Sequence, residues 1–262
     1  MAAFSVAASA QTSSIPDRPT APIRVTSGMV LDFGGRTLDG SAITGDGLFR
    51  CFNADRITIR NVTVTNNPRY AFLGRNCTNA TITNFRMTNM SGSTGGIRFD
   101  IDGDSSGLRM SGIRGDNVGG HAVEVWNANG FNIADVTANN TGSSALLLNN
   151  SRNGTVGTVT GTNNSPSAGY ATFRVANGNG PNVTVSRVVS RNSARGFFSV
   201  SNSSGTTVNA VDIQGARIEG IYIQDSTNTR VVSGSARGAV NCRIRGGSGN
   251  SIGANCGGSI AN

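Results

Sequence analysis

The chain has 262 residues, of which 36 are Gly and only 6% are aromatic, and its formal net charge is +8. This composition suits short strands joined by many turns and excludes a helical bundle, while the lack of any run of about 20 apolar residues argues against a transmembrane helix. All 22 basic residues are Arg, whose planar guanidinium binds carboxylate, sulfate and phosphate. An anionic partner is one explanation, and a compositional bias of the source genome is the alternative for most of these Arg residues.

The first predicted segment, residues 1–24, is an N-terminal extension. It opens on MAAFSVAASAQ, where Ala8-Ser9-Ala10 before Gln11 is typical of a signal-peptide cleavage site. A charged n-region is missing, so an expression scar is the alternative interpretation. We expect a secreted or extracellular protein, with the periplasm as the other possibility.

From residue 47 onward, a segment that opens on a small or polar residue and then alternates in polarity recurs roughly every 19 to 28 residues. A second alternating segment lies between many of its copies. The first kind comprises GLFRCFN (47–53), YAFLGRN (70–76), GIRFDID (96–102), HAVEVWN (121–127), SALLLNN (144–150), ATFRVAN (171–177), GFFSVSN (196–202), GIYIQDS (220–226) and GAVNCRI (238–244), and the second includes RITIRNVTVTN (56–66) and NVTVSRVVSRN (182–192).

Alternation of this kind predicts strands, and strands this short bury their apolar sides only when successive coils stack. We therefore expect an all-β fold over residues 25–262: a right-handed parallel β-helix of about nine coils, with three short strands per coil and a C-terminal cap. Asn and Gly recur where a left-handed backbone is needed, and stacked Asn side chains would satisfy the turns. The predicted bend residues are Asn61, Asn84, Gly112 and Asp135, and the second predicted set is Asn66, Asn89, Asn117, Asn140, Asn164 and Asn192.

The four Cys residues form two pairs that are local in sequence, Cys51 with Cys77 and Cys242 with Cys256. Their spacing does not match a zinc site. We expect two disulfides and hence an oxidising compartment, with free buried thiols as the alternative.

At this point the chain resembles the pectin-lyase-like superfamily of parallel β-helices, over about residues 25 to 250. The superfamily includes pectate lyases, alginate lyases, polygalacturonases and uronan C5-epimerases. The resemblance implies a polysaccharide cleft on the first strand of each coil. Aligned on the first kind of segment, the central outward column is expected to contain Arg50, Phe72, Asp100, Glu124, Leu147, Arg174, Ser199, Tyr222 and Asn241, and the next column Phe52, Gly74, Asp102, Trp126, Asn149, Ala176, Ser201, Gln224 and Arg243.

Three carboxylates, Asp100, Asp102 and Glu124, are expected on adjacent coils, where only a cation or a shared proton would relieve their repulsion. Ca²⁺ prefers such oxygen ligands, so these three residues are the predicted metal set. The other candidates are the catalytic residues Arg174, His121, Tyr170 and Glu124 and the substrate-binding residues Arg98, Asp102, Trp126, Asn149, Arg195 and Tyr222.

The predicted function is a lyase that cleaves a uronate polymer by β-elimination, in which the carboxylate must be neutralised before a base removes the C5 proton. With calcium, the layout of Asp100, Glu124 and Arg174 is similar to that of calcium pectate lyases, with Arg174 or His121 as the base. Without a metal, Arg98 or Arg195 would hold the carboxylate, and Tyr170 or His121 would act as base and acid.

Three alternatives stay open. A hydrolase would use two of Asp100, Asp102 and Glu124, a C5-epimerase would begin with the same proton abstraction, and a non-catalytic adhesin or carbohydrate-binding scaffold would use the surface only. Nucleic acid is a poor fit because Arg is scattered, no membrane partner is expected, and the chain is expected to be a monomer.

Overall fold

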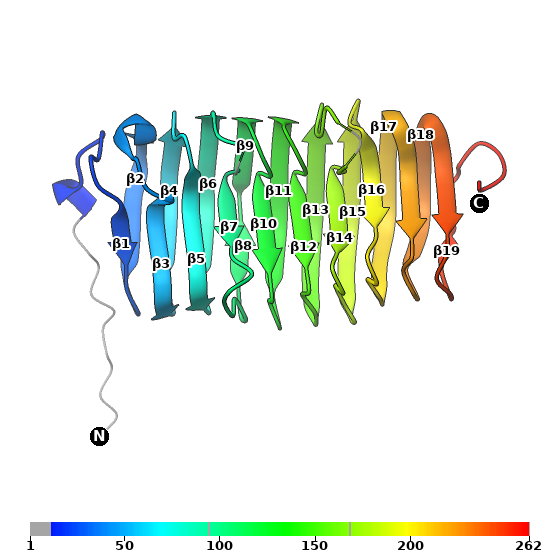
Figure 1. The fold of residues 1–262 in the computed structure, drawn as a ribbon, viewed down its shortest axis with the longest axis horizontal. Helices are drawn as coiled ribbons and strands as arrows, with labels where there is room; N and C mark the ends of the chain where they lie inside the picture. Colours follow the sequence, from blue (N-terminus) through cyan, green and yellow to red (C-terminus); the bar gives the residue numbers. More distant parts are fainter. Residues whose placement is uncertain (1–11, 94, 168, 262) are drawn as a thin grey trace, which may run out of the picture.

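The structure is a computed structural model, and it describes residues 12–93, 95–167 and 169–261. The predicted cleavage site at residues 8–10 lies outside the described residues. Every pairing between its strands is parallel, and each strand except those at the two ends pairs with strands of the preceding and the following turn (Figure 1). The fold is therefore the expected parallel β-helix, and it has about ten turns.

One side of the helix, which we call the first side, carries the repeated first segment. The other two sides are formed by strands that bend midway, and two long strands near the C-terminal end cover all three sides. The first side comprises β1 (Ile23–Val25), β3 (Gly47–Asp55), β5 (Tyr70–Thr78), β7 (Ile97–Phe99), β10 (Val123–Trp126), β12 (Leu146–Asn149), β14 (Phe173–Ala176) and β16 (Arg195–Ser199). The other sides comprise β2 (Val30–Asp39), β4 (Thr58–Thr65), β6 (Thr81–Met90), β8 (Arg109–Ser111), β9 (Ile113–Val118), β11 (Asn132–Thr141), β13 (Gly154–Thr162), β15 (Val183–Arg191) and β19 (Ser251–Ile252), and the long strands are β17 (Thr206–Gln224) and β18 (Arg230–Arg245). Two short 3₁₀ turns, η1 (Thr12–Ser14) and η2 (Gly40–Ala42), lie near the N-terminal end.

The core consists of apolar ladders that run along the helix axis. In one of them each residue pairs in register with the next, so a single inward position is apolar in ten successive turns. Its rungs are Leu31, Ile59, Ile82, Met110, Ile133, Val156, Val185, Val208, Val231 and Ile252. Because parallel strands lie about 4.8 Å apart, each rung contacts the rungs above and below it and buries its apolar surface there.

Asn residues close the turns, largely as expected. Asn61 and Asn84 have positive φ at the predicted bend, and Asn84 donates to the Asn61 side chain over 3.0 Å. Asp135 does not have a positive φ; it accepts a hydrogen bond from the backbone N–H of Gly112 instead. In the second set Asn163, rather than Asn164, continues the ladder, and Asn164 is a buried donor to the backbone.

Two details differ from the sequence prediction. The turn that begins at β1 precedes the first repeated segment, so the prediction of about nine coils missed it. The second and third strands of most turns form one continuous bent strand, as in β4, because Asn61 accommodates the bend without breaking the strand.

Both predicted disulfides are present. Cys51 bonds to Cys77 and Cys242 to Cys256, near the two ends of the rod, and they hint at an extracellular location. In the part of the chain that the structure describes, we find no helix with the length and apolar character needed to cross a bilayer.

Candidate functional site

The outward side chains of the first side form a surface that we call the first face. Backbone pairing fixes its central column, which differs from the sequence alignment at four positions. Phe72 and Ser199 point into the core, and Leu73 and Phe198 take their places. Asp100 and Asn241 lie outside the column, where Arg98 and Arg243 are found instead. The column reads Arg24, Arg50, Leu73, Arg98, Glu124, Leu147, Arg174, Phe198, Tyr222 and Arg243.

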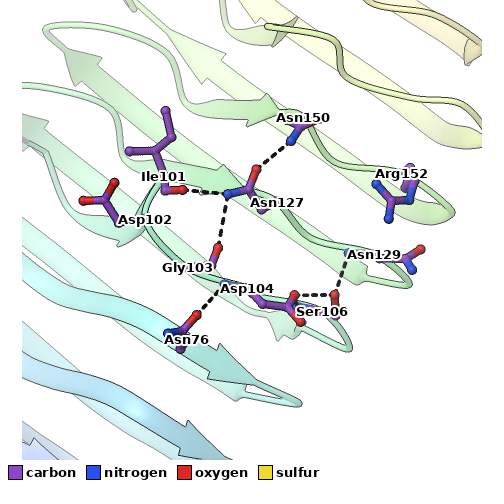
Figure 2. A pocket seen from close by; sticks show the side chains of 10 residues that line it. All are labelled: Asn76, Ile101, Asp102, Gly103, Asp104, Ser106, Asn127, Asn129, Asn150 and Arg152. Carbon is purple, nitrogen blue, oxygen red and sulfur yellow. Dashed lines mark hydrogen bonds between the residues drawn. The ribbon is translucent and has the colours of Figure 1, made fainter.

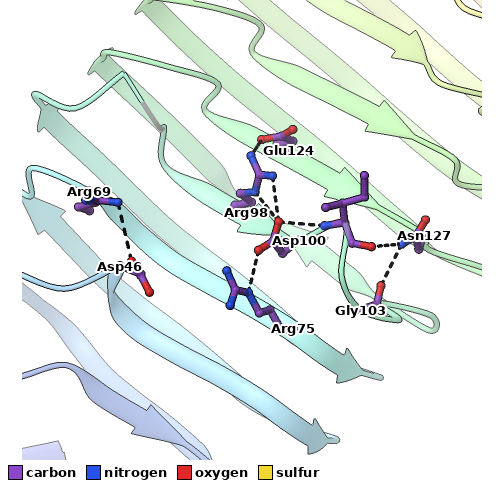
Figure 3. A network of polar contacts seen from close by, with 9 residues as sticks. Asp46, Arg69, Arg75, Arg98, Asp100, Gly103, Glu124 and Asn127 are labelled. Carbon is purple, nitrogen blue, oxygen red and sulfur yellow. Dashed lines mark hydrogen bonds and ion pairs between the residues drawn. The ribbon is translucent and has the colours of Figure 1, made fainter.

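Asp100 and Glu124 belong to a network of charges that we call the acidic network, with Arg75 and Arg98 (Figure 3). Arg98 donates to Glu124 Oε2 over 2.7 Å and to Asp100 Oδ1 over 2.9 Å. Arg75 donates to the other Asp100 oxygen over 2.7 Å. Two guanidinium groups thus neutralise two carboxylates, so the repulsion that the sequence suggested is relieved by Arg side chains.

Hydrogen bonds set the ionisation of Asp100. Burial alone would raise its pKa, but the bonds from Arg75 and Arg98 outweigh burial and hold the pKa below the ordinary value of Asp. Asp100 is therefore a carboxylate at neutral pH. The second oxygen of Glu124 accepts a 2.8 Å bond from the indole N–H of Trp126, which leaves the half-exposed ring of Trp126 on the surface.

Calcium binding by Asp100, Asp102 and Glu124 stays a prediction. Among the described residues, no three His, Cys, Asp or Glu side chains are grouped to hold a metal ion. Asp102 lies in an exposed loop, where it lines an open pocket beside Asn76, Asn127 and Arg152 (Figure 2). The residues of the acidic network already direct their oxygens at nitrogen donors, so this set fits a bound cation poorly.

Three other candidates lie together on the neighbouring turns. The rings of His121 and Tyr170 meet edge to face with centroids 4.7 Å apart, and the Arg174 guanidinium lies 5.0 Å from the centre of the Tyr170 ring. Arg174 makes no hydrogen bond or ion pair with any described residue, and its Nε is buried without a partner. This guanidinium is therefore available for an anionic ligand.

His121 is a neutral donor in this arrangement. Burial, and to a smaller extent the charges of Arg174 and Arg98, lower its pKa to about 3. Its Nδ1 accepts the backbone N–H of Ser144 over 3.1 Å, so the ring proton is on Nε2. His121 can donate a hydrogen bond through Nε2, but it is a weak base.

Beyond Arg174 the first face becomes aromatic, and we call Arg174, Arg195, Phe198, Glu219 and Tyr222 the aromatic cluster. The rings of Phe198 and Tyr222 stack with centroids 5.0 Å apart and an interplanar angle of 2°. Arg195 lies over the Phe198 ring at 4.7 Å and donates to Glu219 Oε2 over 2.5 Å. Since Glu219 is buried and also accepts from Arg243, its charge is fully compensated.

The remaining predicted residues are less accessible than a binding role suggests. Asn149 is completely buried, with its Oδ1 accepting from Asn177, and Tyr222 is 5% exposed. The sequence interpretation missed Arg75, Phe198 and Glu219 as parts of the site. Glu219 carried a signal, because it is one of only two Glu residues in the chain.

No protein-family model matches the chain, and no curated protein or solved structure matches it either. The resemblance to the pectin-lyase-like superfamily therefore rests on the repeat pattern of the sequence.

Proposed function

We propose that the protein is a secreted lyase that cleaves a uronate-containing polysaccharide on the first face. The observation that carries the proposal is the guanidinium of Arg174, which has no ion pair with a described residue and lies next to Tyr170 and a neutral His121. The parallel β-helix fold is compatible with a polysaccharide-active protein. In this proposal the protein is a monomer related to the pectin-lyase-like superfamily.

Arg174 would pair with the carboxylate of the uronate. Pairing with a fixed cation withdraws charge from the carboxylate and makes the neighbouring C5 proton more acidic. The Nε2–H of His121 is a second donor for the same carboxylate. Arg98 and Arg195, which were also candidates for this task, already pair with acidic side chains.

Tyr170 is the proposed base. In its phenolate form its oxygen takes the C5 proton, the electron pair forms the C4=C5 double bond, and the C4–O bond breaks. The phenol then returns the proton to the departing oxygen, so the reaction is balanced without another reactant. The low pKa of His121 makes it a weaker choice for this base.

Hydrolysis through Asp100 has less support than elimination. A hydrolase needs one carboxylic acid that is protonated at neutral pH, whereas the pKa of Asp100 is lowered. A C5-epimerase would use the same base and the same carboxylate partner, and its product differs only in where the proton returns.

The test is to incubate the protein with pectate, alginate, glucuronan and a neutral glucan, each with and without a chelator. We expect one acidic polymer to give the ultraviolet absorbance of an unsaturated uronate, and activity in the chelator would show that calcium is not required. New reducing ends without that absorbance would indicate hydrolysis, inverted uronates without cleavage would indicate epimerisation, and binding without any product would indicate a scaffold.

A further inference from the structure

A second group of unpaired cations lies at the N-terminal end of the first face. Arg24 on β1 and Arg50 on β3 are directly in register on neighbouring strands. Neither makes an ion pair or a hydrogen bond with a described residue, and the Nε of Arg50 is buried without a partner. Like charges opposite each other destabilise a sheet, so this pair would be stabilised by an anion between or above the two guanidinium groups.

The two side chains line a hollow. Its other walls are Val25, Thr26 and Phe52, and its volume is about 180 Å³. Phe52 is 39% exposed, and an exposed ring beside cations suits the apolar face of a sugar. Gly45 makes room for Arg50, since a Cβ at residue 45 would lie 2.0 Å from its Nη2.

The neighbouring turns show that these cations are exceptional. Two turns further along the central column, Arg98 is neutralised by Asp100 and Glu124. Arg75, whose guanidinium lies 5.6 Å from the centre of the Phe52 ring, is neutralised by Asp100. Within the described residues, Asp100 thus neutralises the Arg residues next to the hollow, and no acid pairs with the two that line it.

We propose that Arg24, Arg50 and Phe52 form a distal subsite that binds an acidic sugar residue, through a carboxylate or sulfate group on the guanidinium pair and ring stacking on Phe52. The inference rests on the proposed function for the identity of the polymer, whereas the subsite itself rests on the unpaired charges and the hollow. Arg50 and Arg174 are five turns apart in the central column, which corresponds to about 24 Å at 4.8 Å per turn. A polymer lying along the rod can reach both positions, and a short oligosaccharide cannot.

The experiment compares the double variant Arg24→Gln/Arg50→Gln with the control Arg109→Gln/Arg230→Gln. The control removes the same charge from two exposed positions on another side of the rod. Dissociation constants are measured by affinity electrophoresis in pectate, alginate, dextran sulfate and neutral dextran, and circular dichroism checks that each variant folds. Pectate is compared with trigalacturonate by calorimetry.

We expect the Arg24/Arg50 variant to bind an acidic polymer about tenfold more weakly than the wild type, with little change in the control, because charge-assisted hydrogen bonds are lost. We also expect the loss to be far smaller for trigalacturonate. Equal losses of affinity in both variants would show that only the overall positive charge matters, and they would overturn the subsite. Unchanged binding in the Arg24/Arg50 variant would overturn it as well. If no polymer is cleaved but the selective loss of binding is found, the subsite stands while the proposed lyase activity fails.

Discussion

The acidic network and the aromatic cluster lie on the same face and both contain Arg and Glu, yet the partners of their Arg side chains differ. In the acidic network each guanidinium has a carboxylate within 3 Å, and both acids are satisfied. In the aromatic cluster Arg195 is paired with Glu219, whereas Arg174 lies between the rings of Tyr170 and Phe198 without an anion. The comparison teaches that the crowded acids are already satisfied by Arg side chains, whereas Arg174 contacts aromatic rings and has no carboxylate partner among the described residues.

The largest expected effect is the loss of stability on neutralising Glu219. Glu219→Gln leaves the buried Arg195 without its compensating charge, which costs about 3 to 5 kcal/mol for a buried pair. Urea unfolding measures this change in the free energy of unfolding. Asp212→Asn is the control, because Asp212 pairs with Arg191 at a more exposed position and its loss should cost about 1 kcal/mol or less. Equal losses of unfolding free energy in the two variants would contradict the prediction, because they would mean that burial does not make the Arg195–Glu219 pair more important than the Arg191–Asp212 pair.

The next effect concerns turnover. Arg174→Gln should lower kcat/KM on the uronate polymer by about a hundredfold or more, which is typical of losing one donor to the developing charge. Its midpoint of unfolding should stay close to that of the wild type, because Arg174 has no ion pair among the described residues to lose. Arg230→Gln, on another side of the rod, serves as the control. Full activity in the Arg174 variant would remove Arg174 from the proposed mechanism.

A smaller effect is expected from pH. The pKa of His121 is about 3 in the folded protein and about 6.5 in the unfolded chain, so between these values only the unfolded chain binds the proton. The free energy of unfolding should therefore fall by about 2 to 3 kcal/mol as the pH is lowered from about 6.5 to 4.5. Asp100, whose folded pKa is lowered, contributes a loss only at still lower pH.

The measurement is urea unfolding across that pH window in the wild type and in His121→Gln. The variant should lose most of the pH dependence, since Gln does not titrate. The same slope in both proteins would mean that His121 is exposed and free to ionise in the folded state.

The smallest effect is expected at Asp102. Asp102 lies in an exposed loop and has no ion pair with a described residue, so Asp102→Asn should change stability by about 0.5 kcal/mol or less and leave turnover intact. Chelator-sensitive turnover that this variant abolishes would instead support the calcium hypothesis and reverse the contrast between the two regions.

The fold could be predicted from the sequence because alternation, turn residues and Cys spacing all report on a repeat. Cys51 and Cys77 are 26 residues apart, close to one turn, so a coil of constant length brings them together. The register between neighbouring strands could not be predicted as well from the sequence. The repeated segments do not begin at the same place on their strands, because Gly96 and Gly196 lie one position further along their strands than His121 and Ala171 do.

The candidate site was predicted in its location and only partly in its chemistry. Glu124 and Arg174 do lie on the first face, because strand alternation determines which side chains point outward. His121 lies just before β10, outside the strand, and its ring packs against Tyr170. The partners could not be predicted, since whether Asp100 binds a cation or Arg75 depends on side-chain conformation across turns. The position of Tyr170 depends on a loop, whose path carries no periodic signal.

The Asn ladders bear on how the length of this protein can change. Asn61 and Asn84, like Asn127 and Asn150, are bonded across an interval of 23 residues, and each rung presents the same donor and acceptor to the next. A duplicated or deleted turn of this length would therefore recreate the same contacts at its borders. Insertion or deletion of whole turns would thus change the distance between Arg50 and Arg174 in steps of about 4.8 Å without redesigning either end of the rod.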